Sequence, residues 1–161
     1  MITYQQEFLS SSEGKDREKL LNAHWEEVAL NKDKIKLNPD YDRYYELEEL
    51  GILKIFTVRE SGSLVGYFAC FVMPHLHYKD HYFATNDVIY ISPEHRRGFT
   101  ALKLIKFAEK CLKEDGVSVI QINTKAHKSF SPLLERMGYN QNDILYGKCL
   151  IEDSVNKRKG V

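Results

Sequence analysis

The chain has 161 residues, in which 23 Lys and Arg balance 23 Asp and Glu. This length predicts one domain with a substantial core, and zero net charge gives no general attraction to nucleic acid or to an anionic membrane surface. The three cysteines are odd in number and widely spaced, which argues against a disulfide framework and indicates reduced thiols in a cytoplasmic protein. Neither a signal peptide nor a membrane span is expected, because no apolar run approaches about 20 residues.

The first half of the chain predicts one strand, two helices and a hairpin. Leu20, Leu21, Trp25 and Val28 recur at helical spacing, which indicates an amphipathic helix in which Trp25 belongs to the core. Two apolar runs joined by "RESGS" are typical of a hairpin. The expected elements are strand 2–8, helix 16–30, helix 38–51, strand 52–58 and strand 64–73.

The second half predicts a strand, a long helix and a further strand–helix–strand unit. An apolar stripe marks the long helix, at Ala101, Leu104, Ile105, Ala108, Cys111 and Leu112. The expected strands are 82–92, 117–123 and 144–151, with a short helix over 129–138. The order β-α-α-β-β-β-α-β-α-β predicts an α/β fold with a mixed, mostly antiparallel sheet and helices on both faces.

The start of the long helix carries positive charge, in "PEHRRGFTALKLIKFAE". A helix N-terminus already has a partial positive charge, so Arg96 and Arg97 are mildly unfavourable there. Either the two side chains project into water, or the helix start holds an anion. Composition does not choose between these interpretations.

The strand "VIYISPEHRRGFTA", the long helix, "VSVIQIN" and "LLERMGY" together resemble the Gcn5-related N-acetyltransferases over residues 1–150, with a charged tail over 151–161. The segments "HWEE", "LEELGIL" and "HLHY" are similar to small acetyltransferases of tailed bacteriophages. The resemblance implies acetyl-CoA as cofactor, an amine as acceptor and, for a phage protein, the bacterial host cytoplasm as location.

The resemblance also implies which residues hold acetyl-CoA. Strand amides around Ile89 and Ile91 are expected to hold the thioester and pantetheine arm. The loop before the helix is expected to wrap the diphosphate with its backbone amides. Phe99 stands where a glycine is usual, and the neighbouring Gly98 supplies backbone freedom in a shifted register. The implied loop residues are Arg96, Arg97, Gly98, Phe99, Thr100 and Ala101.

For catalysis, the resemblance places Asp87 near the usual position of the base, although a strand-end residue that caps a turn is the alternative. The usual tyrosine acid is replaced by Leu134, and His127 stands where the helix usually begins with asparagine. Tyr139 or Tyr146 could substitute, with Tyr146 preferred on the last strand, or the thiolate leaves without an acid.

Several further residues are candidates for the acceptor side. Glu26 is a candidate base, and His24 and Glu27 are candidate substrate contacts. For each of them the alternative is a position on a solvated helix face. His75 and His77 are expected to line substrate or to lie on the surface, and no metal site is expected. Tyr41, Tyr44 and Tyr45 either pack or line a pocket for a flat or cationic acceptor.

Three functions compete. The first is an N-acetyltransferase acting on a small-molecule amine or a protein lysine. The second is a binding module that keeps the fold without turnover, such as a phage factor that binds a host protein. The third, acetylation of modified phage DNA, is disfavoured by the zero net charge. A homodimer is left open.

Overall fold

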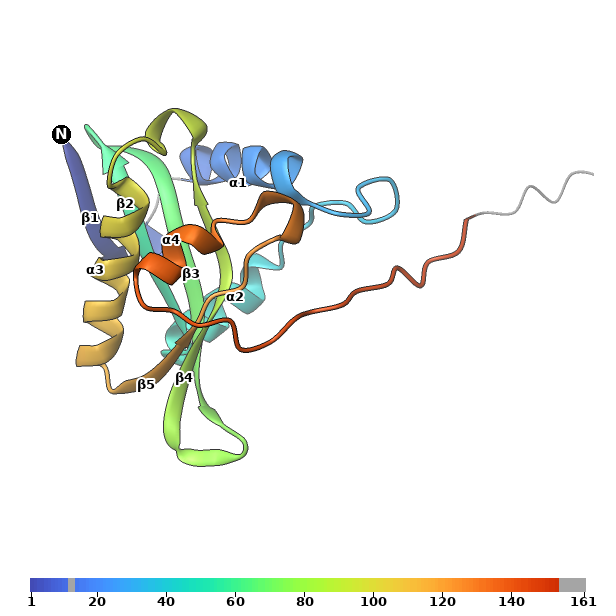
Figure 1. Cartoon of the computed structure of the whole chain (residues 1–161). Coiled ribbons are helices and arrows are strands. Elements are labelled where there is room, and N and C mark those ends of the chain that lie inside the picture. Colours follow the sequence, from blue (N-terminus) through green and yellow to red (C-terminus); the bar gives the residue numbers. More distant parts are fainter. Residues whose placement is uncertain (12–13, 154–161) are drawn as a thin grey trace, which may run out of the picture.

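A five-stranded sheet forms the centre of the computed structural model, which describes residues 1–11 and 14–153 (Figure 1). The strands lie in chain order and comprise β1 (Ile2–Glu7), β2 (Leu53–Glu60), β3 (Ser63–His75), β4 (Tyr78–Ile91) and β5 (Val117–Gln121). The helices are α1 (Gly14–Val28), α2 (Tyr41–Glu49), α3 (Thr100–Glu114) and α4 (Ser131–Arg136), with short 3-10 turns at Leu9–Ser11, Pro93–His95 and Ala126–Lys128.

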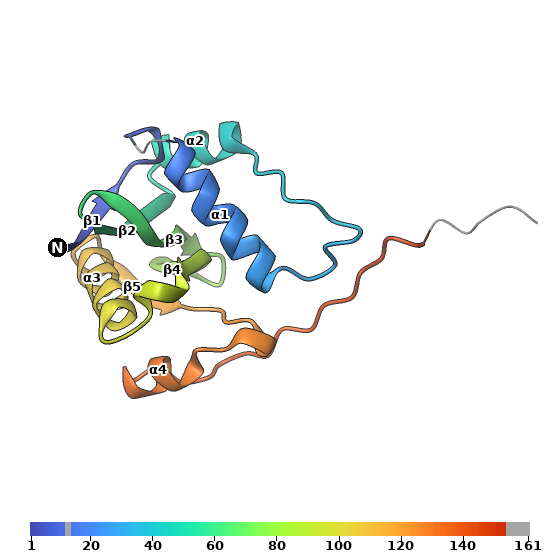
Figure 2. The same ribbon diagram turned by 90° about the horizontal axis from the view of Figure 1, so that it is seen from above.

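The first four strands pair antiparallel, whereas β4 and β5 pair parallel across the α3 crossover. The tight turn between β2 and β3 has positive φ at both central residues, Ser61 and Gly62, as a primed hairpin turn requires. Figure 2 shows α3 on one side of the sheet and α1 and α2 on the opposite side. The predicted mixed sheet with helices on both faces is therefore confirmed.

The main core lies between α3 and the sheet. The helix buries the stripe that the sequence predicts, because Leu104, Ala108 and Leu112 are all 0% exposed. Phe56 and Phe68, on β2 and β3, are equally buried and pack against that stripe. This face of the sheet is therefore closed by a continuous cluster of buried side chains.

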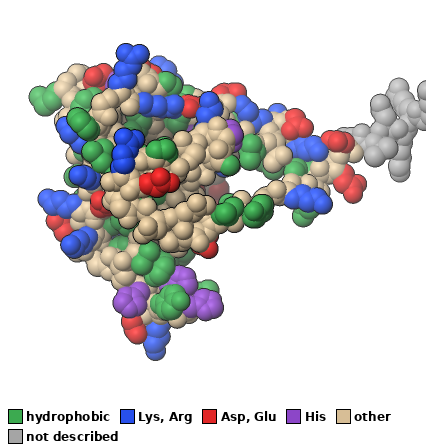
Figure 3. Space-filling view, viewed as in Figure 1, with side chains coloured by type: hydrophobic (Ala, Val, Ile, Leu, Met, Phe, Trp, Pro, Cys, Tyr) green, Lys and Arg blue, Asp and Glu red, His purple; other side chains and the backbone are tan. Residues whose placement is uncertain are grey.

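The last predicted strand, over residues 144–151, is wrong. Residues 139–153 form no helix or strand, and beyond Tyr139 the chain runs away from the sheet as an extended arm (Figure 1). The arm carries exposed apolar side chains, visible as green patches in Figure 3, and Lys34 holds its end through Asp153, at 2.9 Å. Strand-like composition does not make a strand without a partner strand, which is why propensity alone misled here.

Cys70, Cys111 and Cys149 are all free thiols, as expected. Burial raises the pKa of the Cys70 thiol to about 12, so this side chain behaves as a small apolar core residue. Among the described residues, no helix is both long and apolar enough to cross a membrane. Of the predicted tail 151–161, residues 154–161 lie outside the described residues.

Candidate active site

Strand β5 pairs along its length with only the middle of β4. Pairing covers Tyr82 to Thr85 on β4, and β5 ends at Gln121. The Asn86 side chain closes this pairing, because it donates to the Asn123 carbonyl at 3.2 Å and accepts from the Asn123 amide at 2.6 Å. Beyond this point, the last five residues of β4 have no strand on the β5 side within the described chain.

A β-bulge sits where the two strands separate. Ala69 of β3 pairs with Val88 and Cys70 pairs with Asn86, which leaves Asp87 as the extra residue. A bulge of this kind redirects a side chain relative to the regular strand alternation. The Tyr44 hydroxyl of α2 donates to Asp87 Oδ2 at 2.5 Å, and burial together with this hydrogen bond raises the Tyr44 pKa. Asp87 is therefore held by a neutral donor.

Asp87 lines a pocket of about 370 Å³ between the sheet and the α1–α2 side of the molecule. Alternate residues of the strands form its floor, one stripe of α1 forms a wall, and the segment 35–39 with α2 completes it. The floor includes Leu53, Ile55, Thr57, Tyr67 and Ala69, and the walls include Arg17, Leu21, Trp25, Ile35, Leu37, Tyr41 and Tyr44.

The pocket bears on two predictions from the sequence. Of the three tyrosines expected either to pack or to line a pocket, Tyr41 and Tyr44 belong to the lining and Tyr45 does not. Trp25, expected in the core, also lines the cavity. Arg17, Leu21 and Trp25 recur every four residues, which is the sequence signal that could have marked a helix stripe facing one surface. Nothing in the pattern of a single helix says whether the space below that stripe is filled.

The backbone at the end of β4 supports the expectation for Ile89 and Ile91. The Ser92 amide donates to the Val65 carbonyl of β3, at 2.9 Å. Because successive peptide groups of an antiparallel strand point to opposite sides, those of Ile91 and Ile89 point away from β3. The Ile91 carbonyl agrees with this, since it accepts a hydrogen bond from Arg96 Nε at 2.7 Å. These groups face the gap left by β5.

The loop before α3 presents backbone amides without side-chain obstruction. Gly98 has φ of 75°, and a Cβ at this position would meet no atom within 4 Å. Phe99 is the N-cap but caps no amide with its side chain, which is 67% exposed. The first amides of a helix have no partner within that helix, and they favour an anion.

Arg96 does not face this loop with its side chain, contrary to the expectation that its guanidinium joins an anion site. Its two terminal nitrogens donate to the Glu27 carboxylate of α1, at 2.7 and 2.6 Å. The guanidinium also lies 5.1 Å from the centre of the Tyr90 ring. Hydrogen bonding from Arg96 lowers the Glu27 pKa. Glu27 was expected to contact substrate. It is instead the ion-pair partner of Arg96, and through Arg96 it connects α1 to β4.

His24 lies beside this ion pair and away from the pocket lining. Its Nδ1 is 2.8 Å from the Tyr67 hydroxyl, and its ring stacks on Tyr90, with centroids 4.7 Å apart. Burial lowers the His24 pKa to about 4, so the ring is neutral near neutral pH. His24 therefore borders the pocket through Tyr67, which the sequence analysis did not single out.

Two other candidates lie away from Asp87. Glu26 points to solvent and pairs with Lys32 at 3.3 Å. Tyr146 is 88% exposed on the extended arm, not on a strand beside the cofactor. The expected placement of Tyr146 is therefore wrong, because the strand that would have carried it does not form.

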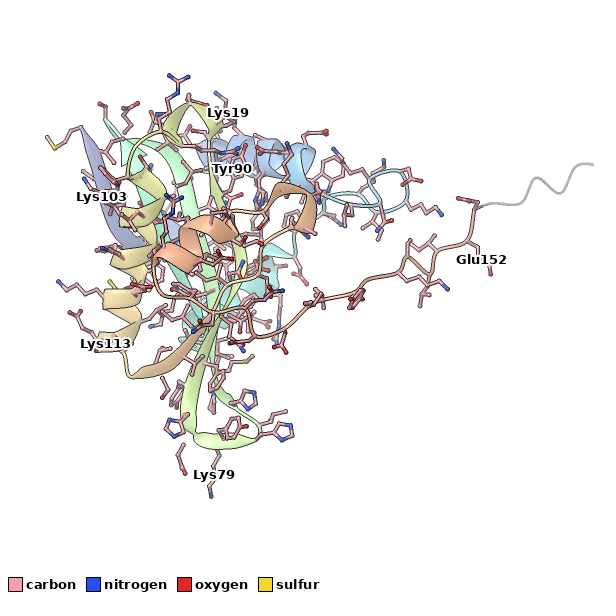
Figure 4. All side chains as sticks on the ribbon, in the orientation of Figure 1. Lys19, Lys79, Tyr90, Lys103, Lys113 and Glu152 are labelled. Atoms are coloured by element: carbon pink, nitrogen blue, oxygen red, sulfur yellow. The ribbon has the colours of Figure 1, made fainter. Side chains whose placement is uncertain are left out.

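His75 is the last residue of β3 and His77 lies in the β3–β4 turn, at the end of a hairpin that projects beyond the sheet (Figure 3). Figure 4 shows Lys79 at the tip of this hairpin and Tyr90 at the opposite end of β4. Nine residues separate Tyr78 from Asp87, which is about 30 Å of extended strand. The two histidines thus lie outside the pocket. Among the described residues, no group of three His, Cys, Asp or Glu side chains is arranged to hold a metal ion.

The structure also locates Leu134 and His127, which depart from the family pattern, and Tyr139, which was a candidate substitute for the missing acid. Leu134 is buried in α4, where it supplies no proton. The Tyr139 hydroxyl donates to Glu109 of α3 at 2.7 Å, and burial and this contact raise its pKa. His127 lies in an exposed 3-10 turn. Neither of the two candidate substitutes, Tyr139 and Tyr146, is therefore placed beside Asp87.

Comparison with solved structures finds the same fold in acetyltransferases. One is an aminoglycoside acetyltransferase from an uncultured soil metagenomic sample in complex with sisomicin, 13% identical, covering 93% of this chain and 97% of that one, with a TM-score of 0.72. Glucosamine-6-phosphate N-acetyltransferase from Arabidopsis thaliana is 14% identical over 92% of this chain and 99% of its own, with a TM-score of 0.68. A predicted acetyltransferase with acetyl-CoA from Clostridium acetobutylicum is 18% identical over 93% and 97%, with a TM-score of 0.64.

A search of curated proteins finds no match. The family model described as Acetyltransferase (GNAT) family matches residues 18–139, which span α1 to the end of α4 and include the bulge, the diverging strands and the loop before α3. The chain therefore belongs to the acetyltransferase (GNAT) family.

Proposed function

We propose that the protein is an acetyl-CoA-dependent N-acetyltransferase that transfers the acetyl group directly to an amine in a ternary complex. The observation that carries the proposal is the position of Asp87. Its carboxylate lines the pocket at the bulge where β4 and β5 separate. Such a position lets one side chain face an acceptor in the pocket and a thioester in the gap between the strands.

The residues around the gap fit acetyl-CoA. The peptide groups of Ile89 and Ile91 face the gap and would pair with the pantetheine arm. The backbone amides of Arg97, Gly98, Thr100 and Ala101 would hold the diphosphate at the start of α3, with Phe99 contributing its amide rather than its ring. Arg96 would act through its ion pair with Glu27, which fixes α1 against β4. Acetyl-CoA supplies the activated acyl group.

In the proposed reaction, Asp87 removes a proton from the bound ammonium group, and the amine attacks the thioester carbonyl. The new bond joins amine nitrogen and acetyl carbon, the bond from that carbon to sulfur breaks, and CoA leaves as thiolate. The second proton that the nitrogen loses passes to water, and the thiolate takes up a proton from water to give the thiol. A thiol has a pKa of about 8.5, so the leaving group needs no strong acid, which suits a site with Leu134 at the usual tyrosine position. The Tyr44 hydroxyl orients the carboxylate.

Two measurements test the proposal. Isothermal titration calorimetry should detect acetyl-CoA binding, and a thiol assay should detect CoA release that depends on an added amine. Asp87→Asn should lower kcat by about 100- to 10,000-fold, the range for loss of a general base, while the Kd for acetyl-CoA changes little. Glu26→Gln, on the solvent side of α1, is the matched control and should keep full activity. Absence of acetyl-CoA binding at millimolar ligand refutes the proposal.

A second function is favoured by the residues that depart from the family pattern. Leu134 is buried and the arm bearing Tyr146 is detached from the sheet, so a protein that binds without turnover is the alternative. Acetyl-CoA binding with no CoA release for any amine would favour it, and steady turnover would refute it. The phage-like origin, the host cytoplasm, a host-protein partner and a homodimer stay predictions from the sequence.

A further inference from the structure

The charges around the pocket indicate how many positive groups its occupant carries. Four ionisable groups besides tyrosine line it, namely Glu7, Arg17, Lys36 and Asp87. Glu7 is already paired with Arg59, at 2.7 Å from Nε, and the Arg59 and Thr57 hydrogen bonds outweigh burial and lower the Glu7 pKa to about 2. Glu7 is therefore a charged partner of Arg59 and not a free site for a ligand.

Asp87 differs from Glu7 in this respect. Among the described residues, no ion pair involves Asp87, and its Tyr44 partner is neutral. The other two charged groups in the lining, Arg17 and Lys36, are cations. Among the described residues, Asp87 is thus the one carboxylate of the lining that is not held in an ion pair, which matches a ligand with one ammonium group.

The rest of the lining is apolar or aromatic. Leu21 and Trp25 of α1 face Ile55 and Leu64 of the sheet, and Ile35 and Leu37 close the space from the connecting segment. Burial of an apolar body is favourable by about 25 cal/mol for each Å² removed from water. The volume of about 370 Å³ corresponds to roughly twelve water molecules at about 30 Å³ each, which suits a small molecule.

We propose that the acceptor is a small primary monoamine with an apolar body, of the arylalkylamine or branched alkylamine class. This inference rests on the proposed function, because it names the substrate of the same site. The ammonium group lies at Asp87, and the apolar body packs between the Trp25 stripe and the sheet floor. Acetyl transfer forms the N-acetyl amide, releases CoA as its thiol, and passes the ammonium proton through Asp87 to solvent.

The test compares amines that differ in body and in charge. With acetyl-CoA, 2-phenylethylamine should show a KM on the order of 30-fold lower than methylamine, since only the former buries a ring. Its kcat/KM should exceed that of spermidine and of sisomicin, which carry several charges. Titration calorimetry in the presence of CoA gives an independent readout, in which 2-phenylethylamine binds and the uncharged 2-phenylethanol does not.

Variants of the pocket lining test where the apolar body of the amine packs. Ala69→Leu places a larger side chain on the pocket floor and should raise the KM for 2-phenylethylamine about tenfold while methylamine kinetics are unchanged. Should this buried substitution impair folding, Ile35→Asp serves instead, because Ile35 is 49% exposed at the pocket wall. Ile35→Asp should raise the KM for 2-phenylethylamine and lower the KM for spermidine. Ile144→Asp, on the exposed arm, is the control and should change neither.

Failure of this inference is distinct from failure of the proposed function. If acetyl-CoA does not bind, the proposed function fails. If acetyl-CoA binds but spermidine, sisomicin or a lysine peptide is acetylated with a higher kcat/KM than every monoamine, the substrate class is wrong and the function stands. If acetyl-CoA binds and 2-phenylethylamine does not bind at millimolar concentration, the substrate class is likewise overturned.

Discussion

The two faces of the sheet use the same strands for different purposes. On β2, Phe56 and Val58 point to α3 and are completely buried, whereas Ile55 and Thr57 point to the opposite face and line the pocket. The period of two in a strand makes this division possible, since each strand supplies alternate residues to each face. One face is filled and stabilises the fold, and the other is left partly open and forms the pocket.

The largest expected effect contrasts one leucine from each helix layer. Leu104→Ala in α3 should lower the free energy of unfolding by about 3 to 5 kcal/mol, because it leaves a cavity in a fully packed region. Leu21→Ala in α1 should cost only about 1 kcal/mol, because Leu21 already borders open space. Urea unfolding followed by circular dichroism measures both. The same substitution on two helices keeps helix propensity constant.

Equal losses for the two variants would contradict the division of the sheet into a filled and an open face. The pair also separates stability from function. Leu21→Ala should weaken binding of an apolar amine despite its small effect on unfolding, whereas Leu104→Ala should not change amine affinity at temperatures where it stays folded. A Leu104→Met variant, which conserves volume, should recover most of the lost stability.

The second prediction concerns pH and the open face. Burial lowers the pKa of His24 from 6.5 to about 4, so the unfolded chain takes up a proton that the folded chain refuses. Above pH 6.5, the titration of His24 has no effect on the free energy of unfolding. As the pH drops from 6.5 to about 4, this titration lowers the free energy of unfolding by on the order of 1 to 3 kcal/mol. Thermal unfolding of wild type and His24→Gln at a series of pH values measures this.

His24→Gln should lack that pH-dependent loss, and the two curves should converge toward the acid end. A loss of equal size in both proteins between pH 6.5 and 4.5 would show that His24 is not the responsible group. Glu7 affects stability at lower pH than His24 does. Its pKa of about 2 lies below the ordinary 4.5, so the stabilisation that it contributes is lost only as the pH falls from 4.5 to about 2. The two windows are therefore separable.

The sequence predicts the filled face of the sheet, which α3 covers, but it does not predict the open face, which forms the pocket. The stripe from Leu104 to Leu112 predicts α3 and its buried side because helical periodicity is a local property. Trp25 has the same apolar spacing, yet it lines a cavity, because local pattern does not report the volume opposite a helix. The Glu27–Arg96 pair joins residues 69 positions apart, and only the tertiary fold brings them together. Asp87 was placed through a family resemblance, whereas the bulge that aims it is a property of two paired strands.

The third prediction separates two neighbouring arginines. Arg96→Ala should leave the Kd for acetyl-CoA within about threefold, because its guanidinium is already engaged by Glu27. Arg97→Ala should raise the Kd for acetyl-CoA by roughly two- to fivefold. The increase should be larger at low salt, as expected for one exposed charge near a diphosphate. A double-mutant cycle for Arg96→Ala and Glu27→Ala should give a coupling energy of about 1 kcal/mol in unfolding experiments. The reverse order of acetyl-CoA affinities would mean that Arg96 leaves Glu27 to bind the cofactor.

The smallest expected effect is at Phe99, where the family pattern has a glycine. Its φ of −109° is accessible to any residue and its ring is mostly exposed, so Phe99→Gly should leave the acetyl-CoA Kd unchanged or at most about threefold tighter. Gly98→Ala is the matched contrast, because a φ of 75° costs about 1 to 2 kcal/mol for a residue with a Cβ. Calorimetry on both variants compares them at adjacent positions. If Phe99→Gly loses affinity more than Gly98→Ala, the ring itself contacts the cofactor, and the loop does not act through its amides alone.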